Sequence, residues 1–318
     1  RTTARCAALD SNRSSSGRAE TRENCMQLSL RVAVDANAAA YRRAVQASTP
    51  GDCWDALVLT ATNEKQAEGY RQELALRHLP VGPTGAFLPT VQRSLVVPDP
   101  PPTKAIPRIG SGGATLGVLR HLMTLYTRDE LLQKRILLIH SGGLSQRLPA
   151  YSPVGKIFAP LPLSRPDGQV ATLFDHLYTT LAGLPDRLGP GMLVLAGDVF
   201  LLFDHRHVPT LSGDAGHGCT AITIRVDPEV AAAHGVFVTD AAGRITRTLQ
   251  KVTPDAMRIA GAVGPDGKVE IDTGILFFAP EAVGVLIDLT AKKLDKPLDL
   301  YEEMVGAMTP GARVWTMV

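Results

Sequence analysis

Short apolar runs alternate with longer stretches of helical spacing along the first two thirds of the chain. Compact apolar runs are typical of buried strands, whereas apolar positions three or four residues apart indicate helices. The predicted strands are residues 55–60, 94–97, 135–140 and 191–196. The predicted helices are residues 64–78, 114–126 and 171–184. This alternation predicts an α/β fold with a doubly wound, mostly parallel sheet, in which ligands bind beyond the carboxyl ends of the strands.

From Thr220 onward the pattern changes to shorter pieces with strand-like composition. The expected strands are residues 220–226, 236–238, 244–249 and 274–278, and the expected helices are residues 281–289 and 300–308. These pieces predict a β-rich, antiparallel or mixed extension of the sheet. The end at Val318 has no helix-stop or tail character. We therefore expect the folded domain, residues 26–318, to be incomplete at its C-terminus.

Residues 1–25 are rich in Arg, Ser and Thr and lack apolar periodicity. This composition predicts a disordered lead-in that lies outside the fold. Its origin stays open between a transit peptide, a linker and an over-extended start. The acidic residues Asp10, Glu20 and Glu23 weigh against a transit peptide, because such peptides are poor in acidic residues.

Composition and charge narrow the class of protein and its partners. The chain has 318 residues, 45% of them apolar, as expected for a globular protein with one large domain or two modest ones. Without the five Arg and three acidic residues of the lead-in, 28 basic and 28 acidic residues remain, so nothing favours a nucleic-acid or membrane partner. The four cysteines form no CxxC pair, and no apolar run approaches the roughly 18 residues of a membrane span. We expect a soluble, cytoplasmic protein.

The strongest chemical signal follows the strand predicted at 135–140. There the chain reads I-H-S-G-G-L-S-Q-R-L-P, and Lys156 follows Arg147 by nine residues. Gly142 and Gly143 let the backbone approach a triphosphate and present N–H groups to its oxygens, while Arg147 and Lys156 add positive charge. A strand that leads into paired glycines and then two cations predicts a nucleotide-phosphate site.

Two motifs in this chain resemble the fucose-1-phosphate guanylyltransferase family, also called GDP-fucose pyrophosphorylases. One is the glycine loop just described together with G-K-I-F-A-P-L-P, and the other is the upstream P-D-P-P with R-I-G-S-G-G-A-T-L. The resemblance covers roughly residues 54–305. It implies a nucleotidyltransferase-type fold whose β-rich extension binds the sugar. It also implies transfer of GMP from GTP to L-fucose 1-phosphate with release of pyrophosphate, an activity that some organisms fuse to an L-fucokinase.

The resemblance assigns roles on the nucleotide side. Gly142, Gly143, Arg147 and Lys156 match positions that hold the triphosphate, with Arg147 and Lys156 stabilising the leaving pyrophosphate. A glycine-rich segment is assigned to the same nucleotide pocket, with a helix-capping loop as the alternative. Its residues are Gly110, Gly112, Gly113 and Thr115.

On the sugar side, Lys251 matches a lysine expected near the sugar phosphate, although Val252 and Thr253 precede the proline that usually follows that lysine directly. Two phosphate-bearing substrates must meet in an in-line attack, which calls for Mg²⁺ held by one or two carboxylates. Asp198, which ends A-G-D, and Asp272, in E-I-D-T-G, are the expected metal ligands. The alternatives are a turn cap for each Asp and a solvated surface lysine for Lys251.

Other functions stay open. A sugar kinase is weakened by the absence of a Gly-Lys-Ser/Thr phosphate loop, and a fused kinase domain would lie beyond Val318. Another sugar-1-phosphate nucleotidyltransferase and a non-catalytic nucleotide-binding module are further alternatives. A dinucleotide-binding oxidoreductase is disfavoured because no GxGxxG opens the first strand-to-helix turn. His205 and His207 lack further ligands at zinc-like spacing, and we expect them in a solvated loop.

Overall fold

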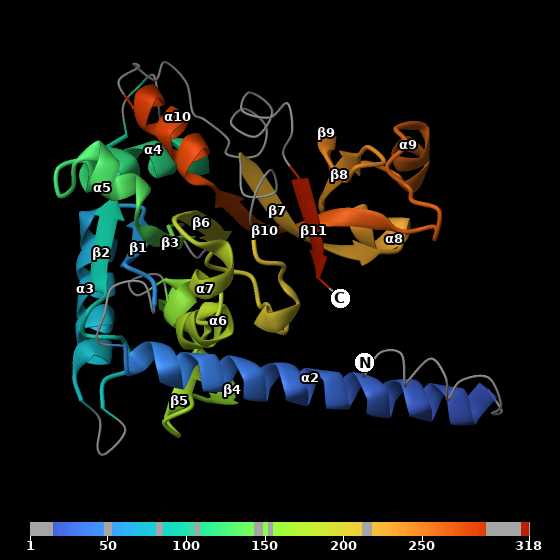
Figure 1. Ribbon diagram of the computed structural model, residues 1–318, viewed down its shortest axis with the longest axis horizontal. Coiled ribbons are helices and arrows are strands. Elements are labelled where there is room, and N and C mark those ends of the chain that lie inside the picture. Colours follow the sequence, from blue (N-terminus) through green and yellow to red (C-terminus); the bar gives the residue numbers. More distant parts are fainter. Residues whose placement is uncertain are drawn as a thin grey trace.

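The structure is a computed structural model that describes residues 15–47, 53–80, 85–102, 104, 109–142, 149–151, 155–211, 218–290 and 313–317. Within these ranges, nine strands form one sheet whose main path runs β11-β7-β10-β6-β3-β1-β2 (Figure 1). The described helices include none that is both long and apolar enough to cross a membrane.

Four parallel strands form the first half of the sheet, in the spatial order β6-β3-β1-β2. They are β1 (Ala56–Ala61), β2 (Arg93–Pro98), β3 (Arg135–His140) and β6 (Gly191–Ala196). Each coincides within two residues with a strand predicted from an apolar run. Because all four are parallel, their carboxyl ends lie at one edge of the sheet.

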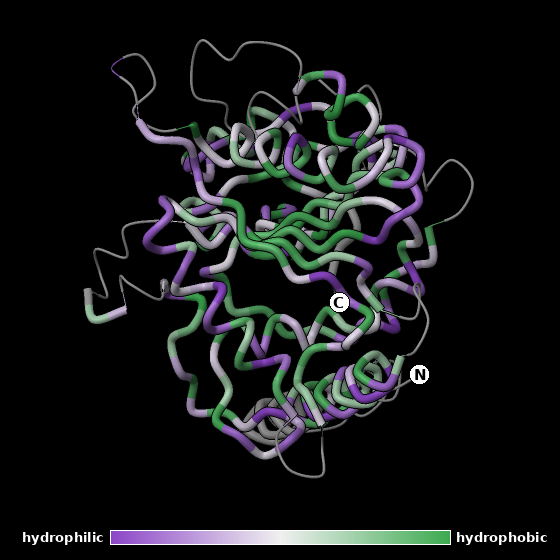
Figure 2. The backbone as a smooth tube through the Cα atoms, turned by 90° about the vertical axis from the view of Figure 1, so that its left-hand side faces the viewer, coloured by the Kyte–Doolittle hydropathy of each residue, from purple (hydrophilic) through white to green (hydrophobic). Residues whose placement is uncertain are grey.

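Alternate side chains of these strands enter two separate cores, one on each face of the sheet. Leu57 and Leu59 pack on one side, whereas Val58 between them packs on the other. The first face is covered by α2 (Ser15–Val45), α3 (Glu64–His78), α6 (Leu173–Leu181) and α7 (Pro185–Leu188). The second face is covered by α4 (Gly110–Leu122), α5 (Arg128–Leu132) and α10 (Pro280–Leu289). Figure 2 shows the hydrophobic strands between the two helical layers, which confirms the doubly wound α/β fold.

The second half of the sheet is mostly antiparallel, as predicted. Its long strand β10 (Val269–Phe278) pairs antiparallel with β6, with β7 (Cys219–Val226) and with β8 (Gly235–Thr239). Strand β9 (Ile245–Gln250) pairs with β8, and β11 (Arg313–Met317) adds parallel to β7. Helices α8 (Pro228–Ala231) and α9 (Pro254–Ile259) share a small core with this extension. Strand β10 begins five residues before the expected start because a bulge interrupts it without ending it.

Helix α2 corrects the prediction for the lead-in. Residues 15–25 are the first part of this continuous helix rather than a disordered segment, and residues 1–14 lie outside the described part of the chain. Further along α2, Ala33, Ala40 and Ala44 are buried against the body of the protein. Once such packing forms a helix, its extension toward the N-terminus is less costly than starting a new helix, because elongation lacks the cost of nucleation.

Short elements complete the connections. They are the hairpin of β4 (Pro160–Ser164) with β5 (Val170–Thr172) and the 3₁₀ turns η2 (Pro149–Tyr151), η3 (Lys156–Phe158) and η4 (His205–His207). His205 is buried and its Nδ1 lies 2.8 Å from Asn37 Oδ1 on α2, so the expectation of a solvated loop is wrong for this residue. The helix predicted at residues 300–308 lies outside the described residues.

Candidate active site

A pocket opens at the carboxyl ends of the parallel strands. It is lined by residues from two connections, the one after β3, which includes the turn η3, and the one after β6: His140, Ser141, Gly142, Lys156, Ile157, Gly197 and Asp198. The structure therefore brings together Gly142, Lys156 and Asp198, which the sequence predicted separately. Their convergence follows from topology, because β3 and β6 are adjacent and parallel.

The backbone at the pocket is packed so closely that a Cβ on its glycines would be in tight contact with neighbouring atoms. A Cβ on Gly197 would lie 3.1 Å from the His140 carbonyl oxygen, and one on Gly142 would lie 3.3 Å from the Thr62 amide nitrogen. At Gly155 the backbone is left-handed, with φ of 67°, and a Cβ would overlap the Tyr70 hydroxyl. The backbone itself therefore forms the surface to which a phosphate would bind.

Lys156 and Asp198 form an accessible ion pair in the pocket. Lys156 Nζ lies 3.5 Å from Asp198 Oδ2, and the two side chains are 33% and 59% exposed. An exposed pair of this kind contributes little to stability, so both groups can exchange their mutual contact for ligands at small cost. A cation and a carboxylate side by side suit a ligand that carries both phosphate and a divalent metal.

His140 holds three elements together beside this pair. The Thr115 hydroxyl on α4 donates to the Ser111 carbonyl at 3.0 Å, so it accepts from His140 Nε2, also at 3.0 Å. Nδ1 is then left to accept from the Thr60 hydroxyl on β1, at 3.3 Å. Burial lowers the pKa of His140 to about 4, so the ring is neutral at pH 7. Thr115 is fully buried and reaches the pocket through His140.

The glycine-rich segment is helical, which corrects the expected start of this helix near Ala114. Gly110, Gly112 and Gly113 belong to the first turns of α4. At Gly113 a Cβ would lie 2.8 Å from Ile109 Cβ, so the close packing at the start of this helix requires glycine there. Their contact with a nucleotide stays a prediction.

Asp272 lies inside β10, at its bulge, rather than before the strand. Its Oδ1 accepts from the Gly274 amide at 2.7 Å. The pairing of β10 with β6 ends at Ile275 and Leu195, so Asp272 occupies the part of β10 just beyond the end of β6, and Asp198 follows that same end. Both predicted metal ligands therefore lie where this pairing stops.

Two residues that the sequence analysis missed meet Asp272. Gly235 and Gln250 pair across β8 and β9. A Cβ on Gly235 would lie 3.2 Å from Gln250 Nε2 and 3.3 Å from Asp272 Cβ, so glycine allows these two side chains to approach its backbone closely. The sequence offered only two separate signals, a glycine at the start of one strand and a polar residue that directly precedes Lys251.

Lys251 follows β9 directly and has an unusual backbone. Its φ is 49°, the one left-handed value among the described residues other than glycine, and its amide donates to the His234 carbonyl at 3.1 Å. A left-handed conformation costs a residue with a side chain about 1 kcal/mol and is found preferentially at functional sites. The side chain is exposed.

The two remaining predicted residues, Gly143 and Arg147, lie outside the described residues. Within the described ranges, no group of three or more His, Cys, Asp or Glu side chains is arranged to hold a metal ion. A magnesium site stays a prediction, since Mg²⁺ takes one or two protein carboxylates and completes its shell with substrate phosphates and water. Asp198 and Asp272 are carboxylates of the required kind, whereas a structural zinc site would need more protein ligands.

Comparison with known proteins adds a family. A family model described as the fucose pyrophosphorylase domain matches residues 128–315. The bifunctional fucokinase/GDP-fucose pyrophosphorylase of Arabidopsis thaliana is 30% identical over 86% of this chain and 29% of that protein. The fucose-1-phosphate guanylyltransferase of Mus musculus is 38% identical over 59% of this chain and 30% of that protein. HddC from Yersinia pseudotuberculosis superposes with a TM-score of 0.36 at 9% identity, over 82% of this chain and 89% of HddC. The chain thus spans less than a third of the length of these curated relatives.

Proposed function

The chain belongs to the fucose pyrophosphorylase family, and from that premise we propose that it transfers GMP from GTP to L-fucose 1-phosphate, forming GDP-L-fucose and pyrophosphate. The observation that carries the proposal is the meeting of Lys156 and Asp198 in a backbone-walled pocket at the carboxyl ends of β3 and β6. A pocket of this kind suits a triphosphate with its metal ion.

Residues of the parallel half of the sheet bind the nucleotide. The backbone around Gly142 binds the phosphates, and Lys156 turns from Asp198 to the β- and γ-phosphates, where negative charge accumulates as pyrophosphate leaves. Arg147 is assigned the same role from the family motif. Asp198 and Asp272 would hold Mg²⁺, which when bound neutralises phosphate charge and polarises the α-phosphorus.

Residues of the antiparallel extension bind the sugar 1-phosphate. Lys251, whose backbone conformation carries a cost, binds the phosphate of L-fucose 1-phosphate. The exposed Gln250, which directly precedes Lys251, supplies hydrogen bonds to the sugar hydroxyls through its amide. The extension and the parallel half meet at the end of β6, so the two substrates meet there.

The chemistry requires positioning more than proton transfer. An oxygen of the sugar phosphate forms a bond to the α-phosphorus of GTP, the bond from that phosphorus to the bridging oxygen breaks, and its electron pair leaves with pyrophosphate. The attacking oxygen is already anionic at neutral pH, so no general base is needed. The neutral His140, whose two nitrogens both have partners, accordingly serves as a structural link and not as a base.

The test is pyrophosphate release from GTP, UTP, ATP and CTP, each with L-fucose 1-phosphate and with other sugar 1-phosphates. We expect turnover with GTP and L-fucose 1-phosphate, and a loss of about a hundredfold or more in Lys156→Ala. Lys65→Ala on the exposed face of α3 is the matched control. Activity with UTP alone, or with no pair of substrates, would contradict the proposal.

A further inference from the structure

Helix α3 buries two polar side chains behind the pocket. Tyr70 is fully buried and the Arg77 side chain is 6% exposed. The two residues are seven positions apart, about two helical turns, so they lie on the same face of α3. A buried hydroxyl and a buried cation are costly unless each has partners, and the partners of these two lead to the pocket loops.

Tyr70 touches both loops at one point. Its hydroxyl donates to the Ser141 carbonyl at 2.8 Å, which ties α3 to the glycine loop after β3. The same hydroxyl lies against Gly155, where a Cβ would overlap it. Burial raises the pKa of Tyr70 to about 12, so the hydroxyl stays protonated and keeps donating at physiological pH. Ser141 lines the pocket and Gly155 directly precedes the pocket residue Lys156, later in the same connection between β3 and β4, and Tyr70 links these two positions.

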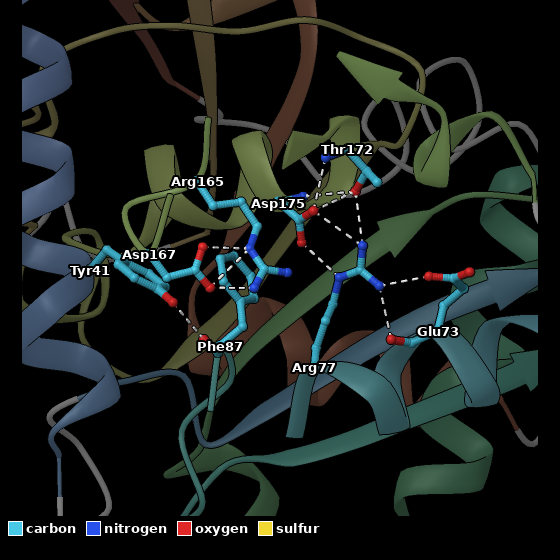
Figure 3. Close-up of polar contacts among 8 residues, drawn as sticks. All are labelled: Tyr41, Glu73, Arg77, Phe87, Arg165, Asp167, Thr172 and Asp175. Carbon is cyan, nitrogen blue, oxygen red and sulfur yellow. Dashed lines mark hydrogen bonds and ion pairs between the residues drawn. The ribbon is translucent and has the colours of Figure 1, made fainter. Parts of the chain in front are cut away.

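Arg77 is held by a complete set of acceptors (Figure 3). Nε and Nη2 donate to the two oxygens of Asp175 on α6, at 2.6 and 3.1 Å. Nη1 donates to the Glu73 carboxylate and carbonyl, at 2.8 and 2.9 Å, and Nη2 also donates to the Thr172 hydroxyl at 3.1 Å. All five N–H groups of the guanidinium are therefore used, which fixes its plane.

That plane supports the turn that carries Lys156. The Arg77 Cζ lies 4.8 Å from the centre of the Phe158 ring, and the Tyr70 ring meets the same ring edge-on, at 5.5 Å between centres. Phe158 ends the 3₁₀ turn that Lys156 begins. Behind the turn, the Leu173 amide on α6 donates to the Ala159 carbonyl at 3.1 Å.

We propose that Tyr70 and Arg77 form a brace that sets the separation between the glycine loop at Ser141–Gly142 and Lys156. Neither residue is among the described residues that line the pocket. They are positioning residues that act through Ser141, Gly155 and Phe158. The inference rests on the proposed function in one respect, namely that Lys156 acts on the substrate phosphates.

Tyr70→Phe tests the brace with the loss of a single hydroxyl, and the chain offers a matched control. Tyr41 is also buried, its hydroxyl donates to the Phe87 carbonyl at 3.0 Å (Figure 3), and neither residue is among the described residues that line the pocket. We expect Tyr70→Phe and Tyr41→Phe to lower the urea midpoint similarly. Only Tyr70→Phe should speed amide hydrogen exchange at residues 141–142 and 155–158, and only it should lower kcat, by about tenfold, with KM within about threefold of wild type.

A double-mutant cycle distinguishes positioning from a general loss of stability. If Tyr70 acts through Lys156, then Tyr70→Phe should have little further effect on kcat in a Lys156→Ala background. Two effects that simply multiply would overturn the inference. Arg77→Lys keeps the charge beside Asp175 but loses the paired guanidinium donors. Amide exchange should therefore rise at residues 155–158, while residues 141–142 keep the protection that Tyr70 provides.

The outcomes also separate the brace from the proposed function. A wild-type protein without pyrophosphate release from any substrate pair would refute the function, and the exchange experiment would still decide on the brace. A fully active protein in which Tyr70→Phe behaves like Tyr41→Phe in both exchange and kcat would refute the brace and leave the function standing. Tyr70→Phe removes only one oxygen atom. It therefore still tests the brace if the Arg77→Lys variant fails to fold.

Discussion

Along the parallel strands the candidate site is a pocket walled largely by backbone, whereas none of the described residues that line it comes from the antiparallel strands, where the predicted site residues are side chains. A Cβ would be in tight contact at Gly142 and Gly197 and would overlap the Tyr70 hydroxyl at Gly155, and the glycine loop is held from behind by buried groups. On the antiparallel side, the exposed Lys251 and the partly exposed Asp272 project from a strand end and a bulge.

Under the proposed function, the two halves recognise their substrates in different ways. Triphosphates share a common geometry, so a rigid wall of N–H groups can bind them with little adjustment. A sugar is distinguished by the arrangement of its hydroxyls, which calls for side chains that can vary without disturbing the sheet. Substitutions in the parallel half should therefore affect folding and catalysis together, and those in the extension should mainly affect sugar phosphate binding.

The largest expected effect is that of Asp198→Asn, at the junction of the two halves. Loss of a metal-binding charge should lower turnover about a thousandfold, or roughly 4 kcal/mol in activation free energy. Without Mg²⁺, however, the variant should bind GTP more tightly than wild type, because Lys156 loses its competing partner. Pyrophosphate release measures the loss of turnover, and calorimetric titrations of GTP with and without Mg²⁺ measure the change in GTP affinity. Asp266→Asn, which neutralises an aspartate paired with Arg225 in the extension, is the control. A wild-type Mg²⁺ dependence in Asp198→Asn would mean that the metal is held elsewhere.

Gly155→Ala should be the most destabilising change in the backbone wall. The new methyl group meets the buried Tyr70 hydroxyl and also requires a left-handed alanine, for a combined loss of at least about 3 kcal/mol in the free energy of unfolding. Gly243→Ala is the matched control, since φ is 74° there but nothing lies within 4 Å of the added atom. That variant should lose only about 1 kcal/mol. Equal losses in urea unfolding would show that close packing at Gly155 contributes nothing.

The neutral His140 makes the parallel half sensitive to acid. Its pKa of about 4 in the folded protein lies below the ordinary value of about 6.5, so the unfolded chain binds the proton first as pH falls. The stabilisation is complete above pH 6.5 and is lost between pH 6.5 and 4, by about 2–3 kcal/mol. Urea unfolding of wild type and His140→Gln across this range measures the difference, because the other titrating groups are unchanged. Parallel curves for the two proteins would contradict this account.

The smallest effect is expected in the extension, at Lys251. Lys251→Gly relieves the left-handed backbone and should raise the free energy of unfolding by up to about 1 kcal/mol. The same variant should raise KM for L-fucose 1-phosphate about tenfold through loss of the charge, with KM for GTP little changed. Lys251→Arg keeps both the charge and the backbone conformation and serves as control. An increase in KM for GTP instead would place Lys251 on the nucleotide side.

The sequence alone determined the parallel half of the sheet. The apolar runs at 135–140 and 191–196 are strands with those bounds, because strands covered on both faces need apolar side chains at every position. Helix α3 also has its predicted bounds, since Asn63 caps its start and Leu79-Pro80 ends it. The convergence of Gly142, Lys156 and Asp198 followed from the rule for strand ends, and the family resemblance is confirmed by the match over residues 128–315.

Tertiary structure decided the rest, because it depends on contacts between segments far apart in the chain. Gly235, Gln250 and Asp272 meet only after β8, β9 and β10 have paired, and no local pattern specifies those registers. The packing of α2 and the glycine start of α4 likewise depend on surfaces supplied by other elements. Tyr70 lies in a helix that the sequence predicts, but only the folded chain brings its hydroxyl to Ser141, 71 positions away.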